Sequence, residues 1–287
     1  MKKDNIAKFE QIRKKTLLEA GAYKKNYFNS KIRVLGISGS ARDKFDMAQE
    51  DSNTEWLLNK CLEECENLGA ESKLIQLRKK NIKYCKACYS TTNAQCHFKC
   101  SCYPEGQDGD DMTNEIYDLC LWADIIVFAS PVNNFKISSL MSLFIDRLIS
   151  MDGSLIPADV NDTKNRDLNI EHTQFISKNA NGTFGSGFLK RLTGKVAGLI
   201  VSGHEEGASM VISQMFMTLN HFGMVFPPFS NVYAMGSMVD DTFKDEVKIK
   251  SDFFEKDVKL LAYNLVGMSK TLKSRKNFWW KYDDSIN

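Results

Sequence analysis

The fold is decided by the stretch RVLGISGSAR at positions 33–42, in which an apolar run leads into a small polar loop. The apolar run predicts a buried strand. The residues SNTE at 52–55 then predict the start of a helix, with Ser52 and Glu55 spaced as a capping box. A strand, a loop and a capped helix gather free backbone N–H groups and the positive end of a helix dipole at one point. This arrangement holds phosphate groups, so the stretch points to a nucleotide-type cofactor.

The composition is that of an ordinary globular protein of one or two domains. Of the 287 residues, 43% are hydrophobic and 26% charged, and the formal net charge is only +2. So small a charge argues against a nucleic-acid partner. The first residues are charged, and no window approaches the roughly 18 apolar residues of a membrane span, so we expect neither a signal peptide nor such a span. These features predict a cytoplasmic protein whose eight cysteines stay reduced.

Apolar patterns alternate between strand and helix along the chain. The expected strands are 33–38, 74–77, 125–129, 196–201 and 231–234, and the expected helices are 4–20, 52–68, 112–122, 138–151, 208–222 and 245–266. Alternation of this kind requires right-handed crossovers, and these build a parallel sheet with helices on both faces. The sequence therefore predicts an α/β three-layer sandwich around a five-stranded parallel sheet, with 125–129 at its centre because this strand is the least polar.

Three polar loops leave the carboxyl ends of predicted strands, at 38–54, 130–135 and 202–207. In parallel sheets ligands bind outside the carboxyl ends, where the strand order reverses. We therefore expect all three loops to meet at one crevice.

Four segments lie outside this plan. Residues 1–30 form an N-terminal helical extension, 85–111 are rich in cysteine, 152–193 are a long polar insertion, and 269–287 are a basic and aromatic tail. The main domain is expected at 31–268. Because long insertions are often functional or mobile, we interpret 152–193, with its glycines, as a candidate lid. The tail is expected to pack on the body of the protein or on a second subunit.

The first loop carries side chains suited to a dianionic phosphate: the hydroxyls of Ser38, Ser40, Ser52 and Thr54, the amide of Asn53, and Arg42. It is neither a Walker loop nor a Gly-x-Gly-x-x-Gly loop. Taken alone, the same residues would also suit a plain strand–helix turn with good capping.

A family resemblance adds to this reading. The loop SGSAR at 38–42 with SNT at 52–54 resembles the phosphate loop of the NAD(P)H-dependent FMN reductase family, whose fold is flavodoxin-like. Further matching motifs follow in that family's order: Asp110-Asp111-Met112, Ala123-Asp124, Ser130-Pro131-Val132 and Phe144-Ile145-Asp146-Arg147. The resemblance covers roughly residues 32–235 and implies FMN at the switch point between the first and third strands.

By this resemblance, three sets of residues surround the flavin. The phosphate would be held by Ser38, Ser40, Arg42, Ser52, Asn53 and Thr54; the isoalloxazine edge would be lined by Pro131, Val132, Asn133, Asn134 and Phe135; the third wall would be Ser202, Gly203, His204, Glu205 and Gly207. One position departs from the family: many relatives have an aromatic residue where this chain has Asn133. The amides of Asn133 and Asn134 could instead match the donors and acceptors of the flavin ring.

Five cysteines stand within 18 residues, at Cys85, Cys88, Cys96, Cys100 and Cys102. Iron–sulfur flavoproteins, relatives of the same family, carry a compact cysteine cluster here for a four-iron cluster, with tighter spacing. Thiolates in tetrahedral sites suit an iron–sulfur cluster or zinc, and a loop of reduced or disulfide-linked thiols is the other interpretation. The remaining cysteines, Cys61, Cys65 and Cys120, fall on apolar helix faces and are expected in the core.

The favoured function is that of an FMN-dependent oxidoreductase, which takes hydride from NADH or NADPH and reduces a small acceptor such as a quinone, a nitro compound or a flavin. The flavin carries this chemistry, so no catalytic acid or base is assigned, and His204 is interpreted as a loop residue near the ring. The alternative is an iron–sulfur flavoprotein that relays electrons. A zinc-knuckle module for RNA is disfavoured by the low net charge. The resemblance further implies a homo-oligomer.

Overall fold

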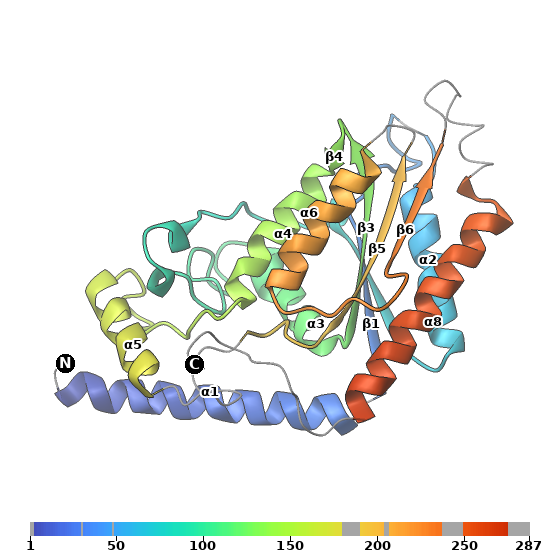
Figure 1. Cartoon of the computed structure of the whole chain (residues 1–287). Coiled ribbons are helices and arrows are strands. Elements are labelled where there is room, and N and C mark those ends of the chain that lie inside the picture. Colours follow the sequence, from blue (N-terminus) through green and yellow to red (C-terminus); the bar gives the residue numbers. More distant parts are fainter. Residues whose placement is uncertain are drawn as a thin grey trace.

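A parallel sheet with helices on both faces forms the centre of the molecule (Figure 1). The computed structural model describes residues 3–29, 31–47, 49–179, 190–203, 207–236 and 249–274. Five parallel strands stand in the order β2-β1-β3-β5-β6: β1 (Arg33–Ser38), β2 (Glu71–Gln76), β3 (Ile125–Asn133), β5 (Val196–Gly203) and β6 (Asn231–Met235). This is the flavodoxin-like order, which confirms the predicted fold class.

The central strand is β3, as predicted. Its residues Ile125 to Ala129 are fully buried, because helices cover the sheet on both faces. In register, Ile37 of β1 lies beside Phe128 of β3, and Phe128 lies beside Leu199 of β5. The carboxyl ends of all three strands therefore lie at the same edge of the sheet.

The helices form two layers (Figure 1). One face is covered by α2 (Asn53–Asn67) and α8 (Asp252–Ser274), and the other by α3 (Tyr117–Trp122), α4 (Ser139–Leu148) and α6 (Ala208–His221). Two further helices, α1 (Lys3–Asn29) and α5 (Arg166–Asn179), lie beside this sandwich. No helix in the described part of the chain has both the length and the apolarity needed to cross a membrane.

The predicted capping box of α2 is half formed. The Ser52 hydroxyl accepts a hydrogen bond from the backbone N–H of Glu55 at 3.1 Å, and the helix ends before Gly69, whose φ of +90° favours glycine. The Glu55 carboxylate does not return to the backbone of Ser52. It bonds Arg78 and Ser38 instead, because a buried polar network competes for it.

Several element boundaries differ from the sequence-based expectation. β3 runs on to Asn133 and turns into the short antiparallel strand β4 (Lys136–Ile137), so the loop expected at 130–135 is a hairpin and the sheet has a sixth strand. Pairing with β5 extends β3, since Pro131 still stands in register with Ser202.

The terminal helices also differ. Helix α1 continues through Gly21 to Asn29, because one glycine costs a helix only about 1 kcal/mol. Helix α8 begins at Asp252 and runs to Ser274, whereas the sequence predicted a helix over 245–266, so residues 269–274 of the predicted tail lie in this helix. The rest of the tail, 275–287, lies outside the described residues.

The insertion is not a plain polar loop, because residues 166–179 form helix α5. Phe175 and Ile176 of this helix pack with Phe9 of α1 in a small separate core. The cysteine-rich segment joins the same unit, since the backbone N–H of Phe98 bonds the carbonyl of Leu155 at 3.1 Å. The described part of the insertion thus packs on α1 and on the cysteine-rich segment. Gly182, Gly185 and Gly187 lie outside the described residues, and the proposed lid stays a prediction.

His172 gives this unit a pH-dependent stability. The ring is 2% exposed, stacks on Phe9 with 4.8 Å between ring centroids, and its Nε2 has no hydrogen-bond partner in the described structure. Burial, helped by the neighbouring His97, lowers the pKa of His172 from 6.5 to about 4. Below pH 6.5 the imidazole of His172 is therefore protonated in the unfolded chain, whereas in the folded chain it stays neutral down to about pH 4.

We predict that protonation of His172 in the unfolded chain lowers the free energy of unfolding by about 3 kcal/mol as the pH falls through this range. His172→Phe keeps a ring against Phe9 and removes the titration, so its stability should fall less steeply as the pH drops. Urea denaturation at a series of pH values measures the difference, with His221→Gln, at a side chain 71% exposed, as the control. Parallel pH profiles for wild type and His172→Phe would contradict the assignment.

Candidate functional site

The three loops predicted to meet do meet at the carboxyl edge of the sheet. The hydroxyls of Thr54 and Ser202 are hydrogen-bonded at 2.6 Å and join the first loop to the third. The Ser138 hydroxyl donates to the carbonyl of Gly39 at 2.7 Å and joins the second loop to the first. A Cβ on Gly207 would lie 3.1 Å from the Cα of Phe135, so the second and third loops also touch.

The first loop presents a set of donors around the N-terminus of α2. Ser40 is 3% exposed, and its hydroxyl accepts from the backbone N–H of Arg42 at 3.3 Å. Asn53 and Thr54 are the first two residues of α2, so their N–H groups have no partner within the helix. The buried Oδ1 of Asn53 has no partner in the described structure. The oxygen and nitrogen of an amide can exchange places, so this side chain can also direct its NH2 group to the same position and donate to a ligand.

Three of the predicted phosphate ligands have side-chain partners within the protein: Ser38, Arg42 and Thr54, whose hydroxyl bonds Ser202. Ser38 is fully buried and donates to Glu55 at 3.0 Å. The Arg42 guanidinium donates to the carboxylate of Glu50 at 2.8 Å, so it would have to share or exchange this partner to bind a phosphate. Ser40, Asn53 and the backbone N–H of Thr54 are therefore placed best for an anion, and Ser52 contributes as the cap of α2.

Sequence reasoning missed the network beneath this loop. Arg78 donates to Glu55 at 2.5 Å and to Asp43 at 3.3 Å, and Gln76 also bonds Glu55. Burial raises the pKa of Glu55, but the hydrogen bonds from Arg78, Gln76 and Ser38 outweigh it, so the pKa lies below the ordinary value. The carboxylate thus stays charged. The only sequence signal was the acidic residue in the first turn of the helix, which also suits a capping box.

The second loop is the hairpin between β3 and β4. Val132 is buried, whereas Asn133, Asn134 and Phe135 are exposed at the tip, and Phe135 is 52% exposed. Asn134 and Phe135 have φ values of 50° and 62°, in the left-handed region. The tip therefore offers two exposed amides and a half-exposed aromatic ring beside the third loop.

The third loop follows β5. Ser202 is buried against Thr54, and Gly203 packs on Val132, to which an added Cβ would come within 3.3 Å. Gly207 has a φ of +120°, a conformation that other residues rarely adopt. The predicted site residues His204 and Glu205 lie outside the described residues.

Four of the five clustered cysteines lie near one another. The sulfurs of Cys88 and Cys102 are 3.9 Å apart. A hydrogen bond from Cys88 lowers the pKa of Cys96, and a hydrogen bond with Cys102, together with burial, raises the pKa of Cys100. Even so, among the residues that the structure describes, no group of three His, Cys, Asp or Glu side chains has the geometry to hold a metal ion. The thiols thus lie near one another but are not arranged as metal ligands.

The other cysteines and the anchor of this segment are buried. Cys61, Cys65 and Cys120 lie in the core, as predicted. Asp110 and Arg147, each with a side chain 1% exposed, form an ion pair at 2.8 Å that ties the end of the cysteine-rich segment to α4. Burial raises the pKa of Asp110, but the hydrogen bond from Arg147 and others outweigh it and the pKa is lowered.

We predict that Asp110→Asn destabilises the protein by about 3–5 kcal/mol, because Arg147 is left as an unpaired buried charge. Asp118→Asn is the control, since Asp118 is 57% exposed and pairs with Lys99 at the surface, where such pairs contribute about 1 kcal/mol or less. Urea denaturation at neutral pH compares the two variants. A loss in Asp110→Asn no larger than in the control would contradict the role given to this ion pair.

The sheet order and the loop cluster define the class: this is a flavodoxin-like α/β protein. Residues 32–159 match the NADPH-dependent FMN reductase family, which confirms the resemblance over this segment. Two curated relatives are iron-sulfur flavoproteins of Archaeoglobus fulgidus. One is 30% identical over 118 residues, which cover 41% of this chain and 46% of that protein. The other is 33% identical over 115 residues, which cover 40% of this chain and 49% of that protein. The matches thus span about half the length of these relatives.

Solved structures share the fold at low sequence identity. RosB, solved with a bound 8-demethyl-8-formylriboflavin-5'-phosphate intermediate, superposes with a TM-score of 0.56 at 18% identity over 86% of this chain and 82% of its own. A flavone reductase superposes with a TM-score of 0.50 at 18% identity over 83% and 63%. At this identity the likeness establishes the fold alone.

Proposed function

We propose that this protein is an FMN-dependent NAD(P)H oxidoreductase, which passes electrons from a nicotinamide to a small acceptor such as a quinone, a nitro compound or a flavin. The observation that carries the proposal is the junction of three loops at the carboxyl edge, with Thr54 bonded to Ser202 and the buried amide oxygen of Asn53 left without a partner. The family match over 32–159 covers the first two of these loops.

The phosphate of FMN fits the first loop on chemical grounds. Ser40, Asn53 and Thr54 offer hydroxyl, amide and backbone N–H donors, and helix α2 directs the positive end of its dipole toward them. Arg42 donates to the carboxylate of Glu50, which carries a single charge. A phosphate dianion carries more charge and would compete with Glu50 for this guanidinium. The network of Glu55, Arg78 and Ser38 would hold the loop rigid from below.

The flavin ring would lie between the second and third loops. Asn133 and Asn134 supply amide donors and acceptors for the ring edge, and Phe135 supplies an exposed aromatic face. FMN, when bound, would supply the hydride chemistry, and the protein would contribute binding, orientation and electrostatics. A homo-oligomer in the cytoplasm is part of the same proposal.

The phosphate assignment predicts that Ser40→Ala and Arg42→Ala each weaken FMN binding by about 1.5–3 kcal/mol, the range for a hydrogen bond to a charged group. Quenching of FMN fluorescence during titration measures the dissociation constant. Ser72→Ala is the matched control, because its hydroxyl bonds Glu66 at an exposed position on β2. Unchanged affinity in both loop variants would remove the basis for the assignment.

The reductase activity predicts that NADH or NADPH bleaches the flavin absorbance of the FMN-loaded protein in a stopped-flow experiment. A quinone or free flavin should then restore the absorbance, because both half-reactions use the same exposed ring. Free FMN at the same concentration is the control for uncatalysed reduction. Rates at the level of free FMN with both nucleotides would exclude the reductase and favour the relay described next.

The second candidate is an electron relay between FMN and a cysteine-bound cluster. It is favoured by the two relatives named iron-sulfur flavoproteins and by the gathering of Cys88, Cys96, Cys100 and Cys102. An iron–sulfur cluster or zinc would require these thiols to move into a ligand arrangement. Analysis of iron, zinc and labile sulfide after anaerobic purification separates this candidate from the reductase.

A further inference from the structure

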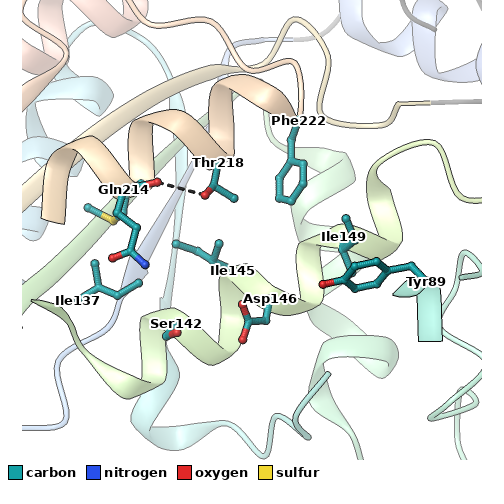
Figure 2. Close-up of a pocket in the computed structure, with 10 residues that line it drawn as sticks. Tyr89, Ile137, Ser142, Ile145, Asp146, Ile149, Gln214, Thr218 and Phe222 are labelled. Atoms are coloured by element: carbon teal, nitrogen blue, oxygen red, sulfur yellow. Dashed lines mark hydrogen bonds between the residues drawn. The ribbon is translucent and has the colours of Figure 1, made fainter. Parts of the chain in front are cut away.

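A separate cavity lies in the helical layer between α4 and α6. Its volume is about 270 Å³, and it is bounded by Ser142 and Asp146 from α4, by Gln214 and Thr218 from α6, and by Ile137 of β4 (Figure 2). It therefore lies beside the sheet, whereas the three loops of the proposed flavin site lie beyond the carboxyl ends of the strands.

The Thr218 hydroxyl of this cavity is satisfied within the fold, since it donates to the backbone carbonyl of Gln214 at 3.1 Å (Figure 2). Asp146 lines this cavity with a side chain that is also exposed to solvent, and it forms no ion pair with any Lys, Arg or His that the structure describes (Figure 2). Burial raises the pKa of Asp146, which is the expected response of a carboxyl without a positive neighbour. A cation in the cavity would supply the missing neighbour.

Two aromatic rings stand at one end of the same cavity. Phe222 directly follows α6, and Tyr89 comes from the short 3-10 helix Cys88–Ser90 (Figure 2). Tyr89 is 41% exposed, so its ring face is open to a ligand. Ile145 of α4 and Ile149, which directly follows this helix, add an apolar wall. Aromatic faces attract cations, and apolar walls bind flat hydrocarbon groups.

We propose that the cavity between α4 and α6 binds a small organic cation, a protonated amine carried on a flat apolar group. The ammonium group would pair with Asp146, and the apolar group would lie against Tyr89 and Phe222. Hydroxyl and amide groups of Ser142 and Gln214 would accept the remaining N–H donors. Binding here requires neither FMN nor a metal at the other sites.

Isothermal titration of the full-length protein at neutral pH and low salt tests this proposal with two probes of the same shape. Benzylamine is protonated under these conditions, whereas benzyl alcohol is neutral. We expect benzylamine to bind about tenfold more tightly, the effect of a charged hydrogen bond of about 1.5 kcal/mol. Equal binding of the two probes, or no binding of benzylamine, would overturn the proposal.

Variants distinguish the contribution of the Asp146 charge to binding from that of the Tyr89 ring. Asp146→Asn should abolish the preference for benzylamine, whereas Asp257→Asn should retain it. Asp257 is a matched control, because burial also raises its pKa but it lies on α8, on the opposite face of the sheet. Tyr89→Leu should weaken benzylamine binding about threefold through the lost cation–π contact. A preference that survives in Asp146→Asn would overturn the assignment, and unchanged urea denaturation shows that the variants are folded.

Discussion

Parallel pairing of β1, β3 and β5 is the constraint on which the rest of the structure depends. Because the three strands run in the same direction and in register, Ser38 lies beside Ala129 and Pro131 beside Ser202. Loops that are distant in sequence therefore start from one edge of the sheet. The contacts between Thr54 and Ser202 and between Ser138 and Gly39 follow from this placement.

Buried ion pairs hold the loops and segments that strand pairing alone does not position. The pairing of Glu55 with Arg78 supports the first loop from below, and the pairing of Asp110 with Arg147 fixes the cysteine-rich segment on α4. Such pairs cost desolvation, but an arrangement that separates the partners leaves an uncompensated buried charge and is strongly disfavoured. The site is thus built by backbone direction first and by buried electrostatics second.

The sequence predicted those features that depend on local pattern. The five parallel strands, the central place of 125–129, the cap at Ser52 and the meeting of the loops were all predicted from apolar periodicity and chain order. Tertiary contacts decided the rest. The partner of Glu55 is Arg78, 23 residues away, and the packing of Phe9 on Phe175 joins segments with no shared pattern. Likewise, the extension of β3 into a hairpin depends on pairing with β5 and not on the polar residues at 130–135.

The proposed function requires FMN to bind at the carboxyl edge, and a crystal structure of the protein with FMN tests this most directly. We expect the phosphate within hydrogen-bond distance of Ser40, Asn53 and the first N–H groups of α2, and the ring beside Asn133, Asn134 and Phe135. Arg42 should then contact the phosphate. A phosphate located elsewhere, or crystals grown with excess FMN that show no flavin at this edge, would contradict the central claim.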